Sequence, residues 1–317
     1  MATKPFEAES PARSWFELLS TLVVYGACLT VAVRANFVPL QIFAAVIAGL
    51  TQFRLFSLYH DHNHNAFLAK STWGRRLMTL IGLHLLAPRS VWKETHDFHH
   101  WNNGKIEWTA VGSYKVLTVD QFRKLSPKER SQYLWSRNPM YVVLGYITVA
   151  ITGFCVQAYR RSPKRHYAGP RAIALHVAAF AAMTWGFGLG AGLLSVVVPS
   201  FVGHWLSAYL FYVQHNFPET HFYKRGTWEY TAAAVEGSSY LVMGPLMNWF
   251  TANIGYHHVH HLNAKIPSYR LPEAMAAIPE MRNPHRTTMK WSDMAACFRL
   301  KVWDPESQTM QPAPTID

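Results

Sequence analysis

Histidine is concentrated in three short segments of the chain. The densest is residues 255–263, which read Gly-Tyr-His-His-Val-His-His-Leu-Asn. If this segment is helical, His257 and His261 lie on one face, and His260 points about 100° away from His261. One helical turn could therefore offer imidazole ligands to two metal centres at once.

The same spacing occurs at His96, His99 and His100, and a third segment, His60-Asp-His-Asn-His64, supplies a further pair four residues apart. Imidazole nitrogen is a good ligand for zinc, copper, iron and nickel. Eight such residues exceed what one tetrahedral zinc ion can use, so the sequence predicts two metal ions with open coordination positions. The eight predicted ligands are His60, His64, His96, His99, His100, His257, His260 and His261.

The acidic residues near these histidines do not match carboxylate-based metal centres. The chain has neither the His-Glu-x-x-His motif of a zinc protease nor the Glu-x-x-His motif of a soluble di-iron bundle. Asp61 and Asp97 instead lie three residues before His64 and His100. We interpret both aspartates as hydrogen-bond acceptors that orient the ligand imidazoles, rather than as direct metal ligands.

Apolar runs of bilayer length indicate a membrane protein. The 317 residues are 50% hydrophobic, and several runs approach the roughly 20 residues that cross a bilayer as a helix. The net charge of +12 comes without a nucleic-acid recognition motif, so we assign the basic flanks to cytoplasmic loops and expect no nucleic-acid partner. The three cysteines are far apart and exclude a disulfide framework. We expect one membrane domain over residues 1–317, with a polar lead at 1–14 and a disordered tail at 304–317.

Two pairs of apolar runs predict two transmembrane hairpins. Trp15–Val33 and Val38–Ser57 are separated by four residues, which forces an antiparallel arrangement. Ala172–Trp185 and Leu193–Val213 form the second pair, across a glycine-rich turn. Each hairpin is followed on its inner side by histidines. We therefore expect the histidine segments to lie just outside the membrane, on that side.

Two other apolar segments do not fit a simple crossing. Trp73–Val91 is interrupted by charged residues and fits a helix in the membrane interface. Met140–Tyr159 has the hydropathy of a span, but a crossing there would put the second and third histidine segments on opposite sides of the bilayer. Because shared metal ligation forbids this, we predict an in-plane or re-entrant element. The predicted fold is an all-α membrane protein with two transmembrane hairpins and interfacial helices, capped by a cytoplasmic histidine-rich domain.

The three histidine segments resemble the histidine boxes of the integral-membrane fatty acid desaturases, which related hydroxylases and ketolases share. Residues 211–217, Phe-Tyr-Val-Gln-His-Asn-Phe, and residues 253–262 resemble the bacterial acyl-lipid desaturases in particular. The resemblance covers most of the chain, from about residue 40 to residue 280. It implies a helical bundle in the membrane and a cytoplasmic domain around two iron ions.

The activity that this resemblance implies is O2-dependent removal of two hydrogens from a fatty acyl chain of a membrane lipid, which leaves a cis double bond. Two electrons would come from a separate donor, such as a ferredoxin or a cytochrome- or flavodoxin-type protein. The implied location is a bacterial inner membrane, with the metal site facing the cytoplasm.

A basic group in the soluble segment after the second histidine segment has two interpretations. It could be a solvated face or contact lipid headgroups, or it could be the docking surface of an acidic electron donor. The group consists of Arg123, Lys124, Lys128 and Arg130.

His215 is a candidate for a ninth metal ligand. It lies at the inner end of the run Leu193–Val213, level with His60–His64 at the end of the other hairpin. The family resemblance implies the same role, since a histidine just after the last span often joins the metal centre. The alternative is an interfacial histidine that is hydrogen-bonded to headgroups or to Asn216.

Other functions on the same scaffold remain open from the sequence. A di-iron hydroxylase, a ketolase or an alkane monooxygenase would use the same histidines, and only the product separates them from a desaturase. A metal transporter is disfavoured, because transporters hold their ligands near the bilayer midplane whereas all three histidine segments lie outside the predicted spans.

Overall fold

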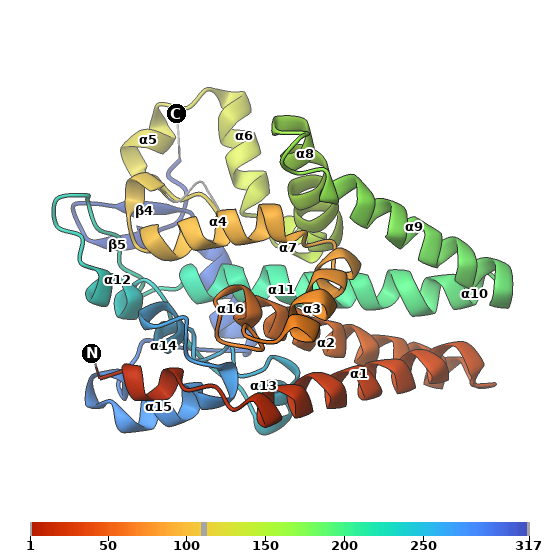
Figure 1. Cartoon of the computed structure of the whole chain (residues 1–317). Coiled ribbons are helices and arrows are strands. Elements are labelled where there is room, and N and C mark those ends of the chain that lie inside the picture. Colours follow the sequence, from red (N-terminus) through yellow and green to blue (C-terminus); the bar gives the residue numbers. More distant parts are fainter. Residues whose placement is uncertain (1, 109–112, 316–317) are drawn as a thin grey trace.

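The computed structural model describes residues 2–108 and 113–315. Most of this part of the chain is helical, as predicted, although it also contains five short strands. Long helices extend toward one end of the molecule, and short helices and strands gather at the other (Figure 1). The strands were not predicted, so the description of the fold as all-α holds only for the long elements.

The first two long helices, α1 (Pro11–Arg34) and α2 (Val38–Asn63), pack along each other (Figure 1). The side chain of Ser10 caps α1 by accepting a hydrogen bond from the backbone N–H of Arg13. α2 continues beyond its predicted end and carries His60 on its last turn. The histidines of the first segment are therefore held by a helix and not by a loop.

Three helical segments of the described residues are long and apolar enough to cross a membrane. They are α1, α2 and Leu189–His215, which comprises α10 (Leu189–Gly192), η4 (Leu193–Val197) and α11 (Val198–His215). The other arm of the predicted second hairpin is α9 (Ala168–Phe187), which is not one of the three. Arg171 and His176 interrupt its apolar run and lower its hydropathy.

The two segments predicted not to cross are both broken helices. Trp73–Val91 divides into α3 (Thr72–His84) and the beginning of α4 (Arg89–Asn102). The region of Met140–Tyr159 divides into three helical elements and is not among the three candidate spans. These elements are α7 (Pro139–Val143), the π-helix η3 (Tyr146–Gln157) and α8 (Ala158–Arg161).

Two glycines allow α2 and α11 to pack closely. A Cβ atom at Gly49 would lie 2.5 Å from the Cβ of Val202, and one at Gly203 would lie 3.1 Å from the carbonyl oxygen of Gly49. Neither position has room for a larger side chain. The two helices therefore run in contact, and their ends bring His60 and His215 into the same region.

A buried ion pair connects α1 and α2 with the short helix α13 (Pro245–Phe250). Arg54 pairs with the carboxylate of Glu17 and also donates to the carbonyl oxygen of Trp249. Its Nε donates to Thr21 Oγ1 at 2.9 Å. The charge of this buried arginine is therefore compensated within the protein.

The remaining elements surround the histidine-bearing ends of the long helices. The other helices are α5 (Val119–Arg123), α6 (Pro127–Ser136), α12 (Tyr230–Glu236), α14 (His257–Leu262), α15 (Leu271–Ala277) and α16 (Trp291–Arg299), with 3-10 turns η1 (Lys4–Glu7), η2 (Ile106–Trp108), η5 (Ser268–Arg270) and η6 (Pro279–Met281). One sheet has the order β1-β4-β5, with β1 (Leu117–Thr118) parallel and β5 (Thr309–Gln311) antiparallel to β4 (Val302–Asp304). A second, parallel pair consists of β2 (Tyr240–Val242) and β3 (Arg286–Thr288).

The expectation of a disordered tail from residue 304 onward is wrong for the residues that form β5. Met310 pairs with Trp303 across the antiparallel β4–β5 ladder. Both side chains are buried, in a cluster that includes Ile106 and Phe222. The local sequence is polar and rich in proline, but the partner strand and the apolar cluster lie elsewhere in the same chain and order it.

Candidate metal centre

Nine histidines from four helices converge at one place, in two groups. In each group, one ring nitrogen per residue lies within 4.8 Å of the corresponding atoms of the others. The first group is His60, His64, His96, His100 and His260, and the second is His99, His215, His257 and His261. All eight histidines of the three sequence segments and the candidate ninth, His215, are thus brought together.

The division between the groups follows the helical spacing. In α4, His96 and His100 belong to the first group, whereas His99 belongs to the second. In α14, His260 belongs to the first group and His257 and His261 to the second. Each of these two short helices therefore presents imidazoles to both groups, because residues one apart point in different directions.

The nitrogens of the second group are spaced as ligands of one ion would be. The Nε2 atom of His261 lies 3.1 Å from that of His257, 3.2 Å from that of His215 and 3.3 Å from that of His99. One imidazole carries at most one hydrogen on Nε2, so it cannot donate to three such neighbours. Nitrogens bound to one ion at about 2.1 Å would be about 3.0–3.4 Å apart. The donor set therefore fits a metal ion.

The nitrogens of the first group have a similar spacing. The Nε2 atom of His100 lies 3.0 Å from that of His96 and 3.1 Å from that of His260. The buried Nε2 atoms of His60 and His64 have no hydrogen-bond partner within the described part of the chain. Buried polar atoms are rarely left without a partner, so these nitrogens are also consistent with a metal ion.

Two of the histidines have an acceptor at the other ring nitrogen. His215 Nδ1 donates to the carbonyl oxygen of Gly237 at 2.9 Å, which leaves the lone pair of Nε2 free for a metal. His60 Nδ1 lies 3.1 Å from Asp61 Oδ1, and the other oxygen of Asp61 accepts a hydrogen bond from the Ser268 backbone N–H at 2.8 Å. Asp61 thus connects α2 with the segment that follows α14.

Asp97 does not have the position that its spacing suggested. Its carboxylate accepts a hydrogen bond from Lys93 Nζ at 2.6 Å, and its side chain is 37% exposed. On α4 it therefore lies on a different side from the histidines that face the two groups. The prediction that Asp97 orients a ligand imidazole is not supported by its contacts.

Burial favours the uncharged form of four imidazoles of the two groups. It lowers the pKa values of His96, His100, His257 and His260 well below the usual value, because an imidazolium would lose its hydration, and neighbouring histidines lower them further. The neutral form is the one that binds a metal. These four histidines therefore favour the protonation state that ligation requires.

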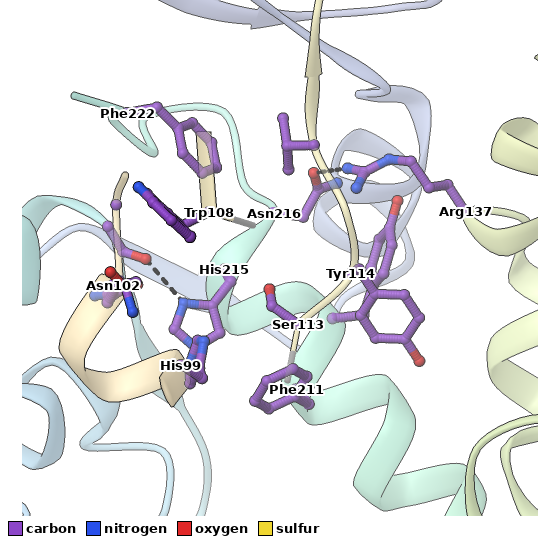
Figure 2. A pocket seen from close by; sticks show the side chains of 15 residues that line it. His99, Asn102, Trp108, Ser113, Tyr114, Arg137, Phe211, His215, Asn216 and Phe222 are labelled. Atoms are coloured by element: carbon purple, nitrogen blue, oxygen red, sulfur yellow. Dashed lines mark hydrogen bonds between the residues drawn. The ribbon is translucent and has the colours of Figure 1, made fainter. Parts of the chain in front are cut away.

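A narrow cavity lies beside the second group (Figure 2). Its volume of ≈ 20 Å³ is enough for about one water molecule. His99 and His215 lie on one side of it and Arg137 on the other, with Phe211 and Tyr114 between them. Arg137 and Tyr114 were not predicted as site residues, since an arginine and a tyrosine in a basic segment have no distinguishing local pattern.

The fold and the centre define a helical membrane protein with a buried cluster of histidines that could hold metal ions. The family model described as "Fatty acid desaturase" matches residues 37–292 of the chain. Because this match covers most of the sequence, the chain belongs to the fatty acid desaturase family.

Individual relatives agree with this assignment. The "Fatty acid desaturase" of Bacillus subtilis (strain 168) is 30% identical over 311 residues, which are 96% of this chain and 86% of that protein. The "sn-1 oleoyl-lipid 12-desaturase" of Synechocystis sp. (strain ATCC 27184 / PCC 6803 / Kazusa) is 25% identical over 79% of this chain and 72% of its own length. The "sn-1 acyl-lipid omega-3 desaturase (ferredoxin)" of the same organism is 26% identical over 74% of this chain and 66% of its own length. The protein is thus an oxidoreductase that desaturates fatty acyl chains.

Proposed function

We propose that this desaturase acts on an acyl chain of a membrane lipid, holds two iron ions and forms a cis double bond with O2 and two electrons. The observation that carries the proposal is the division of nine histidines into two groups with ligand-like spacing. The relatives whose names specify acyl-lipid substrates support the choice of substrate.

The residues of the first group would hold one iron and those of the second group the other. Bound iron would supply the activation of O2 that removal of hydrogen from an unactivated methylene requires. The chain's own contribution is to hold the imidazoles neutral and oriented. Asp61 and the Gly237 carbonyl engage the outer nitrogens of His60 and His215, so that their Nε2 lone pairs face inward.

The cavity residues would exclude bulk water from the reacting part of the substrate. Phe211 packs against His99 and His215, with ring centroids 5.0 Å and 5.3 Å apart, respectively. Trp108 and Phe222 line the same cavity. These aromatic side chains would limit side reactions with water beside the histidines.

Expression in a host with saturated membrane lipids tests the reaction. We expect lipids whose acyl chains are lighter by two hydrogens, with one new double bond at a defined position. Chains that gain oxygen would indicate the hydroxylase alternative instead. A variant with alanine at both His100 and His261 serves as the inactive control.

We infer two transmembrane hairpins, with the N-terminus and the metal centre on the cytoplasmic side of a bacterial inner membrane. The three candidate spans support three of the four crossings, and α9 would be the fourth, since α9 and α10 pack together. A cysteine at Ser162, between α8 and α9, should react only with reagents that enter the cytoplasm. Labelling from the outer face would contradict this topology.

The electrons would come from an acidic donor protein, and the name of one relative specifies a ferredoxin. Arg123, Lys124 and Lys128 are exposed on and between α5 and α6. Exposed cations of one sign attract an acidic partner over several ångströms and accelerate its association. We therefore assign the basic group to donor docking in preference to headgroup contact.

A further inference from the structure

Trp135 is an exposed aromatic residue on the helix that carries part of the basic group. Its exposed fraction is 48%, and it lies on α6 seven residues after Lys128, so both side chains project from the same face of the helix. Glu129 carries the only carboxylate of α6, and this carboxylate accepts hydrogen bonds from the backbone N–H and the hydroxyl of Ser126 at 2.9 Å and 2.6 Å. The face therefore combines exposed positive charge with a large apolar ring.

The helix α5 is held against α6 by an aromatic contact. The rings of Phe122 on α5 and Tyr133 on α6 are both buried, with centroids 5.7 Å apart. Arg123 and Lys124 follow Phe122 directly and are exposed. An acidic protein that is attracted by these cations could bury Trp135, and tryptophan is one of the residues that contribute most to binding at protein interfaces.

A series of ring contacts leads from Trp135 into the protein. The ring of Trp135 lies 6.1 Å from that of Tyr141 on α7, measured between centroids. The ring of Tyr141 lies 6.5 Å from that of Tyr114, which lies 6.3 Å from that of Phe211 on α11. All three distances are typical of aromatic side chains in contact. The series crosses from α6 to α11 without a gap in the packing.

The inner end of this series is the second group of histidines. Phe211 lies closer to His99 and His215 of that group, at 5.0 Å and 5.3 Å, than to His96 of the first group, at 6.5 Å. Tyr114 and Phe211 line the same narrow cavity as His99 and His215 (Figure 2). Continuous ring contacts thus connect an exposed face of α6 with the candidate metal centre.

We propose that the electron donor docks on Trp135, and that electrons pass along the ring contacts from Trp135 to the second group. This inference rests on the proposed function, which assigns the basic group to donor docking. Each ferredoxin molecule would lose one electron to a ferric ion held by the histidines, so two molecules supply the two electrons. The rings would act as a bridge, neither oxidised nor reduced, because electronic coupling is stronger through packed atoms than across a gap.

Reduction of the full-length iron-loaded protein, without O2 and without an acyl substrate, tests the proposal. An acidic [2Fe–2S] ferredoxin in its reduced form is mixed with the ferric protein, and its oxidation is followed by visible absorbance. We expect Trp135→Ala to slow this reaction about tenfold at low ferredoxin concentration, since loss of a central tryptophan contact typically weakens binding by at least this factor. Trp135→Phe should keep most of the rate, because it keeps an aromatic ring.

Trp291→Ala is the matched control. Trp291 is 83% exposed and begins α16, outside the series of ring contacts. This variant should react with ferredoxin at the native rate. A native rate in Trp135→Ala, or equal slowing in Trp135→Ala and Trp291→Ala, would overturn donor docking on Trp135. A native rate together with a lower thermal midpoint in lipid nanodiscs would instead assign Trp135 to the membrane interface.

Tyr114 separates the path from the docking contact, because its ring belongs to the series but lies beside the cavity rather than on α6. Tyr114→Leu should lower the rate at saturating ferredoxin several-fold and leave the half-saturating concentration unchanged. Tyr114→Phe should restore most of the rate, because phenylalanine keeps both ring contacts. A native saturating rate in Tyr114→Leu would overturn the path.

Dithionite shows whether a variant has an intact metal centre. This small reductant needs no protein docking surface, so it should reduce the Trp135 and Tyr114 variants at the native rate. Equal slowing with dithionite and with ferredoxin would mean that these residues act through the folding of the centre, which would overturn the proposal.

The same measurement separates this inference from the proposed function. Slowing by Trp135→Ala but not by reversal of the exposed cations of α5 and α6 would contradict the role of the basic group and leave electron entry at Trp135 intact. The opposite result would overturn entry at Trp135 and retain the basic group. Because no turnover is involved, a protein that accepts electrons through Trp135 yet forms no double bond would contradict only the proposed function.

Discussion

At the scale of single residues, the two ring nitrogens of His60 and His215 have different surroundings. Five of the six Nε2 pairs of the second group lie 2.9–3.3 Å apart, so these atoms face a common point. The Nδ1 atoms of His60 and His215 instead face Asp61 and the Gly237 carbonyl. Two kinds of variant can therefore distinguish a ligand from a residue that orients a ligand.

His215→Ala tests the ninth ligand. We expect the iron content to fall toward one ion per chain and the activity to be lost, because the second group would retain three imidazoles. His221→Ala is the matched control, since His221 contacts the rings of Tyr223 and Trp303 and belongs to neither group. Iron content and turnover at the native level in His215→Ala would refute the assignment.

Asp61→Asn tests the orienting contact. Loss of an outer partner of a ligand histidine typically lowers metal affinity by about 10–100-fold, and we expect a decrease of this size. Asp97→Asn has the same place in its sequence segment but should leave affinity unchanged, because Asp97 pairs with Lys93. Competition with a chelator measures both, and equal effects would mean that the aspartates act through folding.

These two aspartates also show the limit of reasoning from spacing. Both lie three residues before a histidine, so the spacing predicts the same orienting role for each. The structure separates them because α2 turns Asp61 toward Ser268, whereas α4 places Asp97 beside Lys93. The histidines were predictable because the spacing repeats and helices have a fixed period. Arg137 was not, because its setting depends on residues far away in the sequence.

At the scale of elements, the contact between α2 and α11 positions the helix ends that carry His60 and His215. Gly49→Val would place a branched side chain against Val202 and separate the helices. We expect about 1–3 kcal/mol of destabilisation, a lower thermal midpoint and a lower iron content.

Gly26→Val is the control for this substitution. Gly26 lies on α1, and a Cβ atom there would meet nothing within 4 Å. Gly26→Val therefore makes the same chemical change in a helix without a steric clash. A Gly49→Val protein that matches Gly26→Val in both thermal midpoint and iron content would show that the close contact does not position the centre.

The elements themselves were predictable to different degrees. Long apolar runs predicted α1, α2 and α11, because hydropathy over about 20 residues is a strong signal. The short strands were not predicted, since β5 pairs with β4 through contacts that a local sequence pattern does not reveal. The predicted arm Ala172–Trp185 lies within α9 (Ala168–Phe187). Arg171 and His176 lower the hydropathy of this helix, so it is not among the candidate spans.

At the scale of the whole molecule, the basic surface predicts a salt-sensitive reaction with the donor. Reversal of three exposed cations should slow ferredoxin-dependent desaturation by about tenfold at low salt, because electrostatic attraction accelerates association by this amount or more. The three substitutions are Arg123→Glu, Lys124→Glu and Lys128→Glu.

A second triple variant controls for net charge. It reverses three exposed cations from the C-terminal part of the chain, namely Lys265→Glu, Arg282→Glu and Lys290→Glu. This variant should react with ferredoxin at nearly the native rate. Equal slowing of both triple variants, or none in either, would contradict donor docking at α5 and α6.

The most direct test of the whole account is the number of iron ions in protein purified from iron-supplied cells. Elemental analysis should find two irons per chain in the native protein. It should find about one when His96 and His100 are both alanine, and about one when His257 and His261 are, because each pair belongs to a different group. One iron or none in active native protein, or complete loss of iron from either double variant, would contradict two separate ions held by the two groups.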